Sequence, residues 1–399
     1  MRKRINEIIC RERSIKLLLL ILSKVVGLFQ THSKTKFDDK HLKVLHISPI
    51  FFDVDKSLQG GGERAPLELA KTMAKYCETR YISFGNEFRS LNYDKLPIKI
   101  YPYIGLFNHE RNNPINFKFL SEIRWADVVH CHPYYSITTD FSILVARLFG
   151  KKVFVTDYGG RVVNYNKELQ LDRLVDKFLV ISEFGKQFFD DFKTKKEVIY
   201  LGIDEKKFYP LPNKKQDYVL YVGRILPHKG ISYLVEAVNT LNVKLHIVGS
   251  ALHKGYFKYL ENIADKEKVE FITDVPDESL LKEYNNALVT ILPSVYKDIY
   301  GNEHKGPELL GLVLLESMFC ETPVICTKVG AMPEVVKEGK TGFVVPGCDN
   351  KALAEKIDYL AKHKETAKQM GIEGRKFVLE NFTMDKVALK CLECYINGQ

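Results

Sequence analysis

The stretch Tyr218-Val-Leu-Tyr-Val-Gly-Arg-Ile-Leu-Pro-His-Lys-Gly230 decides the fold class of this 399-residue chain. Its first five residues form an apolar run typical of a buried strand, and residues 232–239 have the spacing of a helix. A strand, a loop with glycine and a helix make the first part of a βαβ unit, from which parallel sheets are built. The stretch therefore predicts that an α/β domain begins here.

The same alternation of strands and helices runs through both halves of the chain. A helix pattern at 63–75 follows the first strand, and Pro210 and Pro212 in a polar segment mark a boundary between two such series. We therefore predict two Rossmann-like, doubly wound domains, 41–208 and 217–380, joined by a linker at 209–216. A last helix at 381–399 would pack back on the N-terminal domain. The predicted strands lie at 44–48, 81–84, 127–130, 152–156, 178–181, 197–200, 218–222, 243–248, 269–272, 288–292, 323–326 and 342–345.

Composition narrows the function classes. A formal charge of +9 favours anionic partners such as phosphates, nucleotides or an acidic membrane surface. The charge is too diffuse to indicate nucleic-acid binding, and no zinc-finger, RNP-like or basic-zipper pattern is present. The eight cysteines are scattered, and Cys391-Leu-Glu-Cys394 has no second pair, so a reducing, cytoplasmic compartment fits better than a disulfide framework or a metal knuckle.

Residues 1–40 form a separate basic and apolar segment. The apolar run from Ile15 to Phe29 is interrupted by Lys16 and Lys24 and is short for a helix that spans a bilayer. It also lacks the small-residue cleavage site of a secretory signal. The spacing predicts a helix that lies in a membrane interface with its lysines facing lipid phosphates, or one packed on the protein's own surface, with a spanning anchor as a minor option. The positions at helical spacing are Ile8, Ile15, Leu18, Leu19, Leu22, Val26 and Phe29.

A glycine-rich turn, Gln59-Gly60-Gly61-Gly62-Glu63-Arg64, lies between the first predicted strand and the first predicted helix. Glycines let the backbone approach a ligand closely, and the amino terminus of a helix attracts anions. The turn is therefore a candidate for phosphate or sugar contact at Gly61 and Gly62. It is not GxGxxG and has no Walker lysine, so the usual marks of nicotinamide hydride transfer and of P-loop hydrolysis are missing.

Four charged residues in the second half carry the strongest chemical signal. Arg224 and Lys229 follow the strand at 218–222, after Gly223, and an arginine fork with a compact lysine charge suits a diphosphate. Glu308 and Glu316 flank the glycine turn of Glu308-Leu-Leu-Gly-Leu-Val-Leu-Leu-Glu316, and carboxylates accept hydrogen bonds from vicinal sugar hydroxyls. If a helix begins after this turn, Glu316 lies in a largely apolar helix and needs a partner. The exposed amides for phosphate oxygens would then be those of Gly311, Leu312 and Val313.

Polar residues also follow the strands of the first half. His130-Cys-His132 ends one strand, and His132, the outer histidine, is the better candidate for a ligand site. HxH alone lacks a third zinc ligand, so no metal is predicted. Asp157 and Arg161, around the glycines after the next strand, are candidates to orient an acceptor, although the segment could also be an ordinary glycine turn.

Taken together, these motifs resemble glycosyltransferase family 4, whose members have the GT-B fold, two facing Rossmann-like domains with an interdomain cleft. The ordered set of matches covers residues 43 to about 345. The matching pieces are Gly60 to Arg64, Asp127 to His132, Val180 to Glu183, Leu201 to Asp204 with Phe208 and Pro210, Tyr221 to Arg224 with Lys229 and Gly230, Ile247 to Gly249, Glu308 to Glu316, Thr322 to Val324, and Gly330 to Glu334 with Gly339 to Phe343.

The resemblance implies transfer of a sugar from a nucleoside-diphosphate sugar, with retention at the anomeric carbon and without a metal cofactor. By position, Arg224 and Lys229 would bind the diphosphate and stabilise the departing phosphate charge. Glu308 would face the donor sugar's hydroxyls, Glu316 would hold the ribose, and His132 would lie beside the donor sugar. The acceptor would be a glycan, a lipid-linked sugar or a polysaccharide, and the donor phosphate itself would help to deprotonate it.

The chain departs from the family at three places. Asp157 stands where many members have a histidine, the approach to Glu308 from Val295 to Pro307 is longer than usual, and Gly249 lacks the common glycine–aspartate–glycine continuation. Two other functions keep the same fold: a nucleotide-sugar epimerase, and a non-catalytic subunit that binds a nucleotide-sugar. Product formation without an acceptor would distinguish the first, and a purified chain that neither hydrolyses nor transfers the donor would indicate the second.

Overall fold

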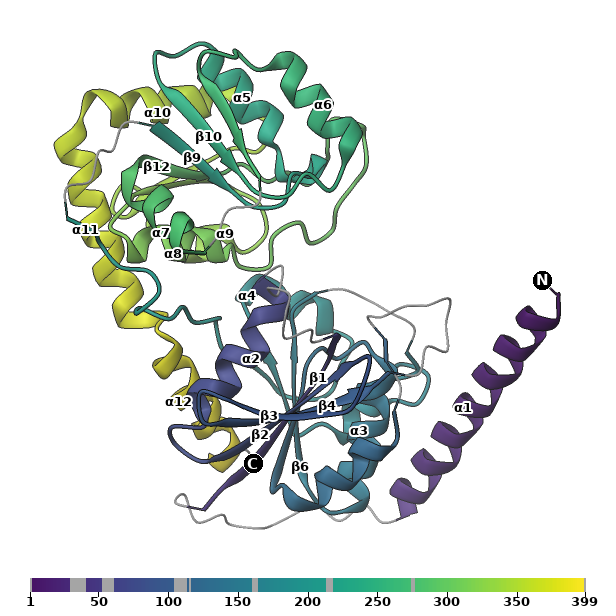
Figure 1. Cartoon of the computed structure of the whole chain (residues 1–399). Coiled ribbons are helices and arrows are strands. Elements are labelled where there is room, and N and C mark those ends of the chain that lie inside the picture. The colour runs from purple at the N-terminus through teal and green to yellow at the C-terminus, as the bar shows by residue number, and fades with distance from the viewer. Residues whose placement is uncertain are drawn as a thin grey trace. The chain divides into compact units, whose positions relative to one another are not determined.

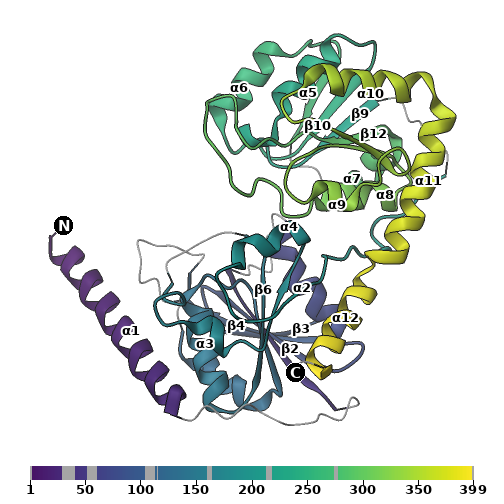
Figure 2. The same ribbon diagram turned by 180° about the vertical axis from the view of Figure 1, so that it is seen from behind.

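The computed structural model describes residues 2–28, 41–51, 61–103, 113–114, 116–159, 164–212, 218–273 and 277–397. The chain divides into two compact units (Figures 1 and 2). Unit 1 comprises Met1–Ile181, Gly185–Tyr200 and Met384–Gln399, and unit 2 comprises Ser182–Phe184 and Leu201–Thr383. The short helix α4 (Glu183–Lys186) contains the sequence boundary between them.

Unit 1 is built on an eight-stranded sheet with the order β3-β4-β2-β1-β5-β6-β7-β8. All neighbours pair in parallel except β3, which runs antiparallel to β4 at the edge. Parallel strands buried on both faces read as continuous apolar runs, which is why the central strands could be located in the sequence. The strands are β1 (Lys43–Phe51), β2 (Glu78–Gly85), β3 (Arg89–Tyr93), β4 (Leu96–Pro102), β5 (Val128–Cys131), β6 (Lys152–Asp157), β7 (Lys177–Val180) and β8 (Lys196–Val198).

Side chains that alternate along these strands build one core on each face of the sheet. Leu45 and the strand side chains on the same face of the sheet pack with α3 (Ile137–Leu148) and the 3₁₀ segment η1 (Lys118–Trp125). Val44 and the strand side chains on the opposite face pack with α2 (Gly61–Met73) and with α12 (Met384–Asn397), the last helix described. This alternation is the period of two expected of a strand. The short 3₁₀ segments η2 (Leu171–Leu174) and η3 (Gln187–Phe189) complete the unit.

The N-terminal helix α1 (Arg2–Leu28) lies against α3 of unit 1. Ile15, Leu19 and Val26 are buried in the same core as α3, and each such burial stabilises the contact by roughly 1.5–3 kcal/mol at most. This contact is the one expected of a helix packed on the protein's own surface, and membrane association of the segment stays a prediction. Among the described residues, none of the helices combines the length and the apolar character that a bilayer-spanning segment needs.

Unit 2 contains a six-stranded, fully parallel sheet with the order β11-β10-β9-β12-β13-β14. This is the 3-2-1-4-5-6 order of a Rossmann domain. Helices cover both faces, with α5, α6 and α10 on one and α7, α8 and α11 on the other (Figure 1). The strands are β9 (Tyr218–Val222), β10 (Lys244–Val248), β11 (Val269–Ile272), β12 (Ala287–Leu292), β13 (Val324–Thr327) and β14 (Gly342–Val345). The helices are η4 (Pro227–Lys229), α5 (Ile231–Asn239), α6 (Lys254–Ile263), α7 (Asp277–Asn286), α8 (Leu312–Phe319), α9 (Met332–Val335), α10 (Asn350–Lys362) and α11 (Lys364–Asn381).

The twelve predicted strands all occur, with ends within a few residues of the prediction. The expectation of purely parallel sheets was wrong at one edge, because β3 and β4 were not predicted and β3 is antiparallel. Four of the five residues of β3 are exposed, so its sequence has no apolar periodicity to detect. Residues 29–40 of the predicted N-terminal segment, residues 213–216 of the predicted linker and residue 217 lie outside the described residues.

Candidate functional site

In unit 2, the strand order reverses between β9 and β12, and ligands of doubly wound sheets bind beyond the carboxyl ends of the strands at such a point. The loop after β9 holds Gly223 to Gly230, and the loop after β12 holds Pro293 to Gly311. The two loops are hydrogen-bonded, since the Val295 amide donates to the His228 carbonyl at 2.9 Å. The four charged candidates of the second half therefore come from the switch point and from the helix that follows it.

Lys229 and Glu308 form an ion pair in which the Lys229 ammonium donates to Glu308 Oε1. The same oxygen accepts a hydrogen bond from the Ser294 hydroxyl at 3.0 Å. Only 12 % and 11 % of the two charged side chains are exposed, so each charge needs the other. Within the described part of the chain no donor reaches Glu308 Oε2, which leaves that oxygen available to a ligand hydroxyl.

Two glycines allow the loops around this pair to approach each other. Gly230 has a φ of +64°, and a Cβ there would lie 2.0 Å from the Pro293 carbonyl oxygen. Gly249 has a φ of +147°, and a Cβ there would lie 2.0 Å from the Gly223 carbonyl oxygen. Only glycine combines these backbone angles with such close contacts. The glycines therefore serve packing of the loops as well as access for a ligand.

Arg224 lies on the same loop and is exposed, and within the described residues its guanidinium has no hydrogen bond or ion pair. Its carbonyl accepts a hydrogen bond from the Tyr221 hydroxyl at 3.0 Å, which fixes the backbone of the loop. An exposed guanidinium beside a lysine–glutamate pair is free to accept a phosphate. The structure thus brings Arg224, Lys229 and Glu308 into one loop cluster.

The helix expected after the glycine turn is α8, which begins at Leu312 with Gly311 as its N-cap at a φ of +90°. Leu312 and Val313 occupy its first turn, where backbone amides have no partner inside the helix. Glu316 lies further along and accepts a 2.6 Å hydrogen bond from the Tyr284 hydroxyl. The partner that the sequence required for this carboxylate is thus found, and the proposed contact with a ribose stays a prediction.

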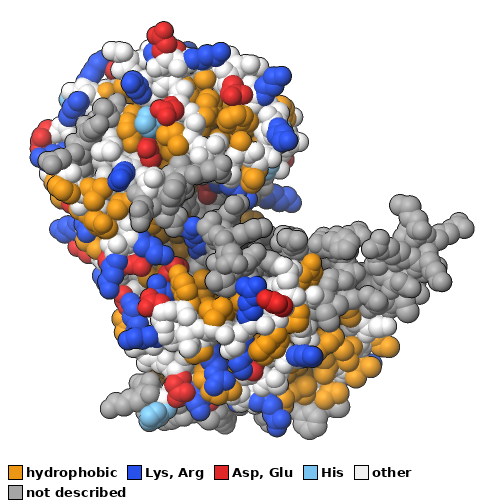
Figure 3. Space-filling model, in the orientation of Figure 1, with side chains coloured by type: hydrophobic (Ala, Val, Ile, Leu, Met, Phe, Trp, Pro, Cys, Tyr) orange, Lys and Arg blue, Asp and Glu red, His pale blue; other side chains and the backbone are white. Residues whose placement is uncertain are grey.

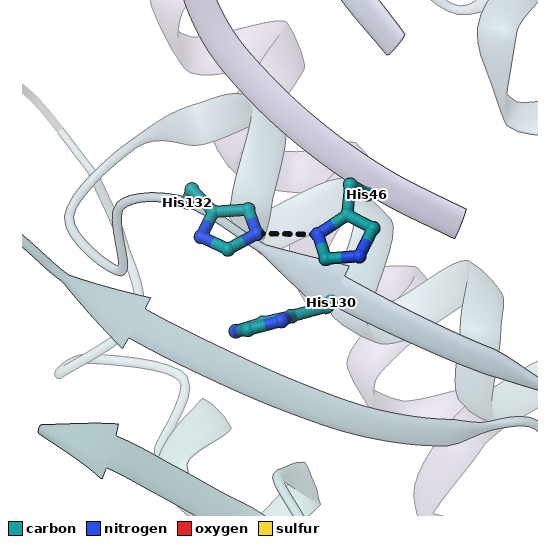
Figure 4. Close-up of side chains that lie close together, drawn as sticks. All are labelled: His46, His130 and His132. Carbon is teal, nitrogen blue, oxygen red and sulfur yellow. Dashed lines mark hydrogen bonds between the residues drawn. The ribbon is translucent and has the colours of Figure 1, made fainter. Parts of the chain in front are cut away.

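Three histidines gather at the corresponding switch point of unit 1, between β1 and β5 (Figure 4). His46 of β1 lies beside His130 of β5 in the sheet register, and His132 follows directly. His46 Nδ1 and His132 Nε2 are 3.0 Å apart, and the ring centroids of His130 and His132 are 4.0 Å apart. All three side chains are fully buried. The sequence indicated His130 and His132 but not His46, which only the strand order brings next to them.

Every ring nitrogen of these histidines has a protein partner. His46 Nε2 faces Met73 Sδ at 3.3 Å, and His132 Nδ1 lies 3.0 Å from the Tyr158 hydroxyl. His130 lies between two hydroxyls, Thr156 Oγ1 at 2.8 Å and Tyr395 at 2.6 Å. A metal would have to replace several of these hydrogen bonds, so the geometry describes a buried polar network more directly than a metal centre. His132 has no free ring nitrogen in this arrangement, and its contact with a donor sugar stays a prediction.

The last helix of the chain contributes to this network. Tyr395 of α12 is fully buried, bonds His130 through its hydroxyl and accepts a 2.9 Å hydrogen bond from Lys152 Nζ at its carbonyl. At the other end of α12, the Asp385 carboxylate bonds Lys75 and Tyr76, which follow α2. The helix after Thr383 is thus part of unit 1, on the face of the sheet that carries His46 and His130.

The buried histidines predict that unit 1 loses stability in mild acid. Burial lowers the pKa of His46 to about 3 and also lowers the pKa of His130 and of His132 well below 6.5. Below pH 6.5 the unfolded chain therefore binds protons that the folded chain does not, and each histidine lowers the free energy of unfolding by about 1.4 kcal/mol per pH unit. Asp140, whose pKa burial raises to about 8, acts in the opposite direction.

The effect can be isolated as a difference between variants. The single tryptophan, Trp125, lies in unit 1, so its fluorescence during urea unfolding reports on that unit. Between pH 6.5 and 5, the His46→Gln variant should show a smaller slope than the wild type, by about 1.4 kcal/mol per pH unit. The exposed control His41→Gln should keep the wild-type slope. Equal slopes in all three proteins would contradict this account.

The other predicted site residues are placed less completely. Gly61 and Gly62 begin α2, as the glycine turn predicted, while Gln59 and Gly60 lie outside the described residues. Asp157 is the last residue of β6, and its carboxylate accepts a 3.3 Å hydrogen bond from the Gly159 amide. Arg161 lies outside the described residues. The acceptor roles of Asp157 and Arg161 and the donor role of the glycine turn stay predictions.

The second half of the chain is similar to known glycosyltransferases. Residues 202–377 match the family model described as Glycosyl transferases group 1. The chain is also similar to the capsular polysaccharide biosynthesis glycosyltransferase CapM of Staphylococcus aureus, with 33 % identity over 192 residues, 45 % of each protein. That stretch spans about half the length of the relative.

Solved structures show that the fold of the whole chain is GT-B. Sucrose-phosphate synthase of Thermosynechococcus elongatus superposes with a TM-score of 0.68 at 20 % identity and covers 89 % of this chain and 98 % of its own. HepE of Anabaena, in complex with UDP and glucose, has a TM-score of 0.68 at 16 % identity and covers 88 % and 99 %. At these identities the likeness concerns the fold alone, and it confirms the predicted class of two Rossmann-like domains.

Proposed function

We propose that the protein is a retaining glycosyltransferase that moves a sugar from a nucleoside-diphosphate sugar to a glycan, lipid-linked or polysaccharide acceptor. The observation that carries the proposal is the Lys229–Glu308 pair at the switch point of unit 2, with the exposed Arg224 on the same loop. The site offers a group suited to each part of the donor. The two cations suit the diphosphate, and the carboxylate suits the hydroxyls of the sugar. The group 1 match over this domain supports the same reading.

In this mechanism Lys229 and Arg224 bind the diphosphate and stabilise the negative charge that develops on the leaving phosphate. Glu308 keeps Lys229 positioned through Oε1 and accepts a donor-sugar hydroxyl at Oε2. The amides of Gly311, Leu312 and Val313 receive phosphate oxygens at the start of α8, and Glu316 holds the ribose together with Tyr284. The donor phosphate removes the acceptor proton, and no metal cofactor takes part. His132, Gly61 and Gly62 are assigned to the donor, and Asp157 and Arg161 to the acceptor.

The acceptor class and the compartment are proposed on different grounds. Similarity to a glycosyltransferase named for capsular polysaccharide biosynthesis supports a polysaccharide or its lipid-linked precursor as acceptor. The described cysteines, from Cys77 to Cys394, are all free thiols, which supports a reducing, cytoplasmic site of action.

The decisive experiment incubates the purified full chain with a panel of nucleotide-sugars, with and without a lipid and glycan extract, and follows donor and product by mass spectrometry. Loss of one donor with release of its nucleoside diphosphate and a glycosylated product supports the proposal. An isomeric nucleotide-sugar formed without an acceptor would indicate an epimerase. If no donor is consumed although one binds, the chain is a binding subunit and the proposed reaction is wrong.

We also propose that α1 holds the enzyme on an anionic membrane surface. The helix buries one face on α3, yet Leu17, Leu18, Leu20 and Ile21 on its outer side remain 38–59 % exposed. Figure 3 shows apolar side chains gathered at the lower right, where the C-terminal half of α1 lies in Figure 1. Residues 1–40 contain ten lysines and arginines and four acidic residues, so they supply +6 of the net charge of +9. An apolar face beside a concentrated positive charge suits anionic lipid headgroups.

Vesicle co-sedimentation tests the membrane proposal. Wild-type protein should bind vesicles that contain an anionic lipid, more weakly at high salt, and the Leu17→Glu/Ile21→Glu variant should bind at least about tenfold more weakly. Leu389→Glu is the matched control, because Leu389 is 43 % exposed on α12 of the same unit. This control should bind as the wild type does. Wild-type binding that is equal for neutral and anionic vesicles, or absent from both, would refute the proposal.

A further inference from the structure

The long approach to Glu308 folds into a β-hairpin, residues 296–304, whose function the motifs left open. Lys297 and Glu303 pair as an antiparallel bridge, and the Asp298 amide donates to the Asn302 carbonyl at 3.0 Å. The His304 amide closes the base by donating to the Tyr296 carbonyl at 2.7 Å. The extra residues therefore form an ordered element with its own hydrogen bonds.

The Asp298 carboxylate holds the hairpin together from inside. Only 2 % of its side chain is exposed, and it accepts hydrogen bonds from the amides of Tyr300 and Asn302 and from the Asn302 side chain. His304 Nε2 lies 3.1 Å from Asp298 Oδ2. Burial alone would raise the pKa of Asp298, but hydrogen bonds from His304 and Asn302 outweigh burial and lower this pKa to about 2.

The ionised carboxylate fixes which nitrogen of His304 is available. Because a carboxylate only accepts hydrogen bonds, His304 must donate through Nε2, and neutral His304 then carries a lone pair on Nδ1. Within the described part of the chain Nδ1 has no partner, and 30 % of the side chain is exposed. The hairpin thus presents one oriented acceptor nitrogen.

That nitrogen belongs to the same loop cluster as Lys229 and Glu308. The ring centroid of His304 lies 4.8 Å from that of His228, the residue before Lys229. The Tyr296 hydroxyl accepts the Gly330 amide at 2.9 Å, and the next amide, that of Ala331, donates to the Glu308 carbonyl at 3.1 Å. Burial, together with the charges of Lys229 and Arg224, lowers the pKa of His228 to about 4. The hairpin therefore contacts the loop that carries Lys229 and is bonded to the Gly330 segment, which in turn bonds Glu308.

We propose that His304, oriented by Asp298, contacts the sugar of the nucleotide-sugar donor and determines which sugar is accepted. The inference rests on the proposed function and adds to it the element that selects the donor. A fixed acceptor nitrogen can accept a hydrogen bond from a sugar hydroxyl in one configuration. In the epimer the hydroxyl points elsewhere, so this hydrogen bond is not made. Glu308 Oε2 and His304 Nδ1 would accept hydrogen bonds from hydroxyls at two positions of the sugar ring.

The test compares two donors that share a nucleotide and differ in the configuration of one hydroxyl, such as UDP-glucose and UDP-galactose or another pair that includes the preferred donor. In His304→Phe, kcat/KM for the preferred donor should fall about 10- to 100-fold and that for its epimer much less, so that selectivity is lost. Asp298→Asn should shift selectivity in the same direction. Lys305→Ala, an exposed neighbour, is the matched control and should keep the wild-type selectivity.

Affinity for the bare nucleoside diphosphate separates this inference from the function on which it rests. All hairpin variants should bind the diphosphate within about twofold of the wild type, because the cations that hold it are unchanged. An equal loss of kcat/KM for both donors, or unchanged selectivity in His304→Phe, would overturn the role of His304. A wild-type protein that binds no nucleoside diphosphate would instead overturn the proposed function itself.

Discussion

The variants Lys229→Met and Glu308→Gln should each lose at least about 10²-fold in transfer rate, and each should also unfold more easily than the wild type. Removing one partner leaves the other charge almost buried, with 12 % or 11 % of its side chain exposed. The double variant Lys229→Met/Glu308→Gln removes both charges together. It should therefore regain most of the lost stability while it remains inactive, with a coupling free energy of about 1–3 kcal/mol between the two sites.

This double-mutant cycle separates a structural role of the pair from a catalytic one. Rates would be measured with the preferred donor, and stability by urea unfolding followed by circular dichroism. The control pair is Lys362–Asp358 on α10, whose atoms are 2.6 Å apart but whose side chains are 69 % and 41 % exposed. Lys362→Met should change stability by less than about 1 kcal/mol. Turnover near the wild-type level in the double variant would contradict the proposed chemistry.

Replacing Gly330 with alanine should destabilise unit 2 by more than about 3 kcal/mol and abolish activity. A Cβ on Gly330 would lie 2.0 Å from the Glu308 carbonyl oxygen, so backbone must move at the residue that pairs with Lys229. The Gly330 amide also bonds Tyr296, so the hairpin should move as well.

Gly339→Ala is the matched control for this clash. Gly339 has a φ of +71° against +57° at Gly330, but nothing lies within 4 Å of its Cβ position. Both substitutions therefore carry the backbone strain of about 1 kcal/mol, and the difference between them measures the contact with Glu308. Hydrogen exchange of α8 and of the hairpin would locate the change. If both alanine variants were equally stable, the close approach of these two loops would be wrong.

Much of the fold could be read from local sequence. The central strands are buried on both faces, so they appear as unbroken apolar runs, and β9 occupies the predicted residues 218–222. The N-terminal helix and the helix after Gly311 were also predicted, because periodicity and a glycine stop or start are local signals. The edge strand β3 was missed because its exposed residues carry no such signal.

The site was predictable only where a charged residue lies next to a strand end or a helix start in the sequence. Arg224, Lys229 and Glu308 were found in this way. His46 was missed, because a histidine inside a strand has no local mark of function and gains one only when β1 pairs with β5. Tyr395 was missed for the same reason, since it meets His130 from 265 positions away.

The order of apolar runs, glycine loops and helices along the chain was enough to specify two parallel α/β sheets, since hydrogen-bonding period and burial act between near neighbours. Tertiary structure alone decided which buried polar groups complete one another: Lys229 with Glu308, Glu316 with Tyr284, and His130 with the hydroxyls of Thr156 and Tyr395. A buried charge or lone pair must be satisfied by whatever the packed chain brings near it, and strand order, which no local pattern encodes, determines what that is.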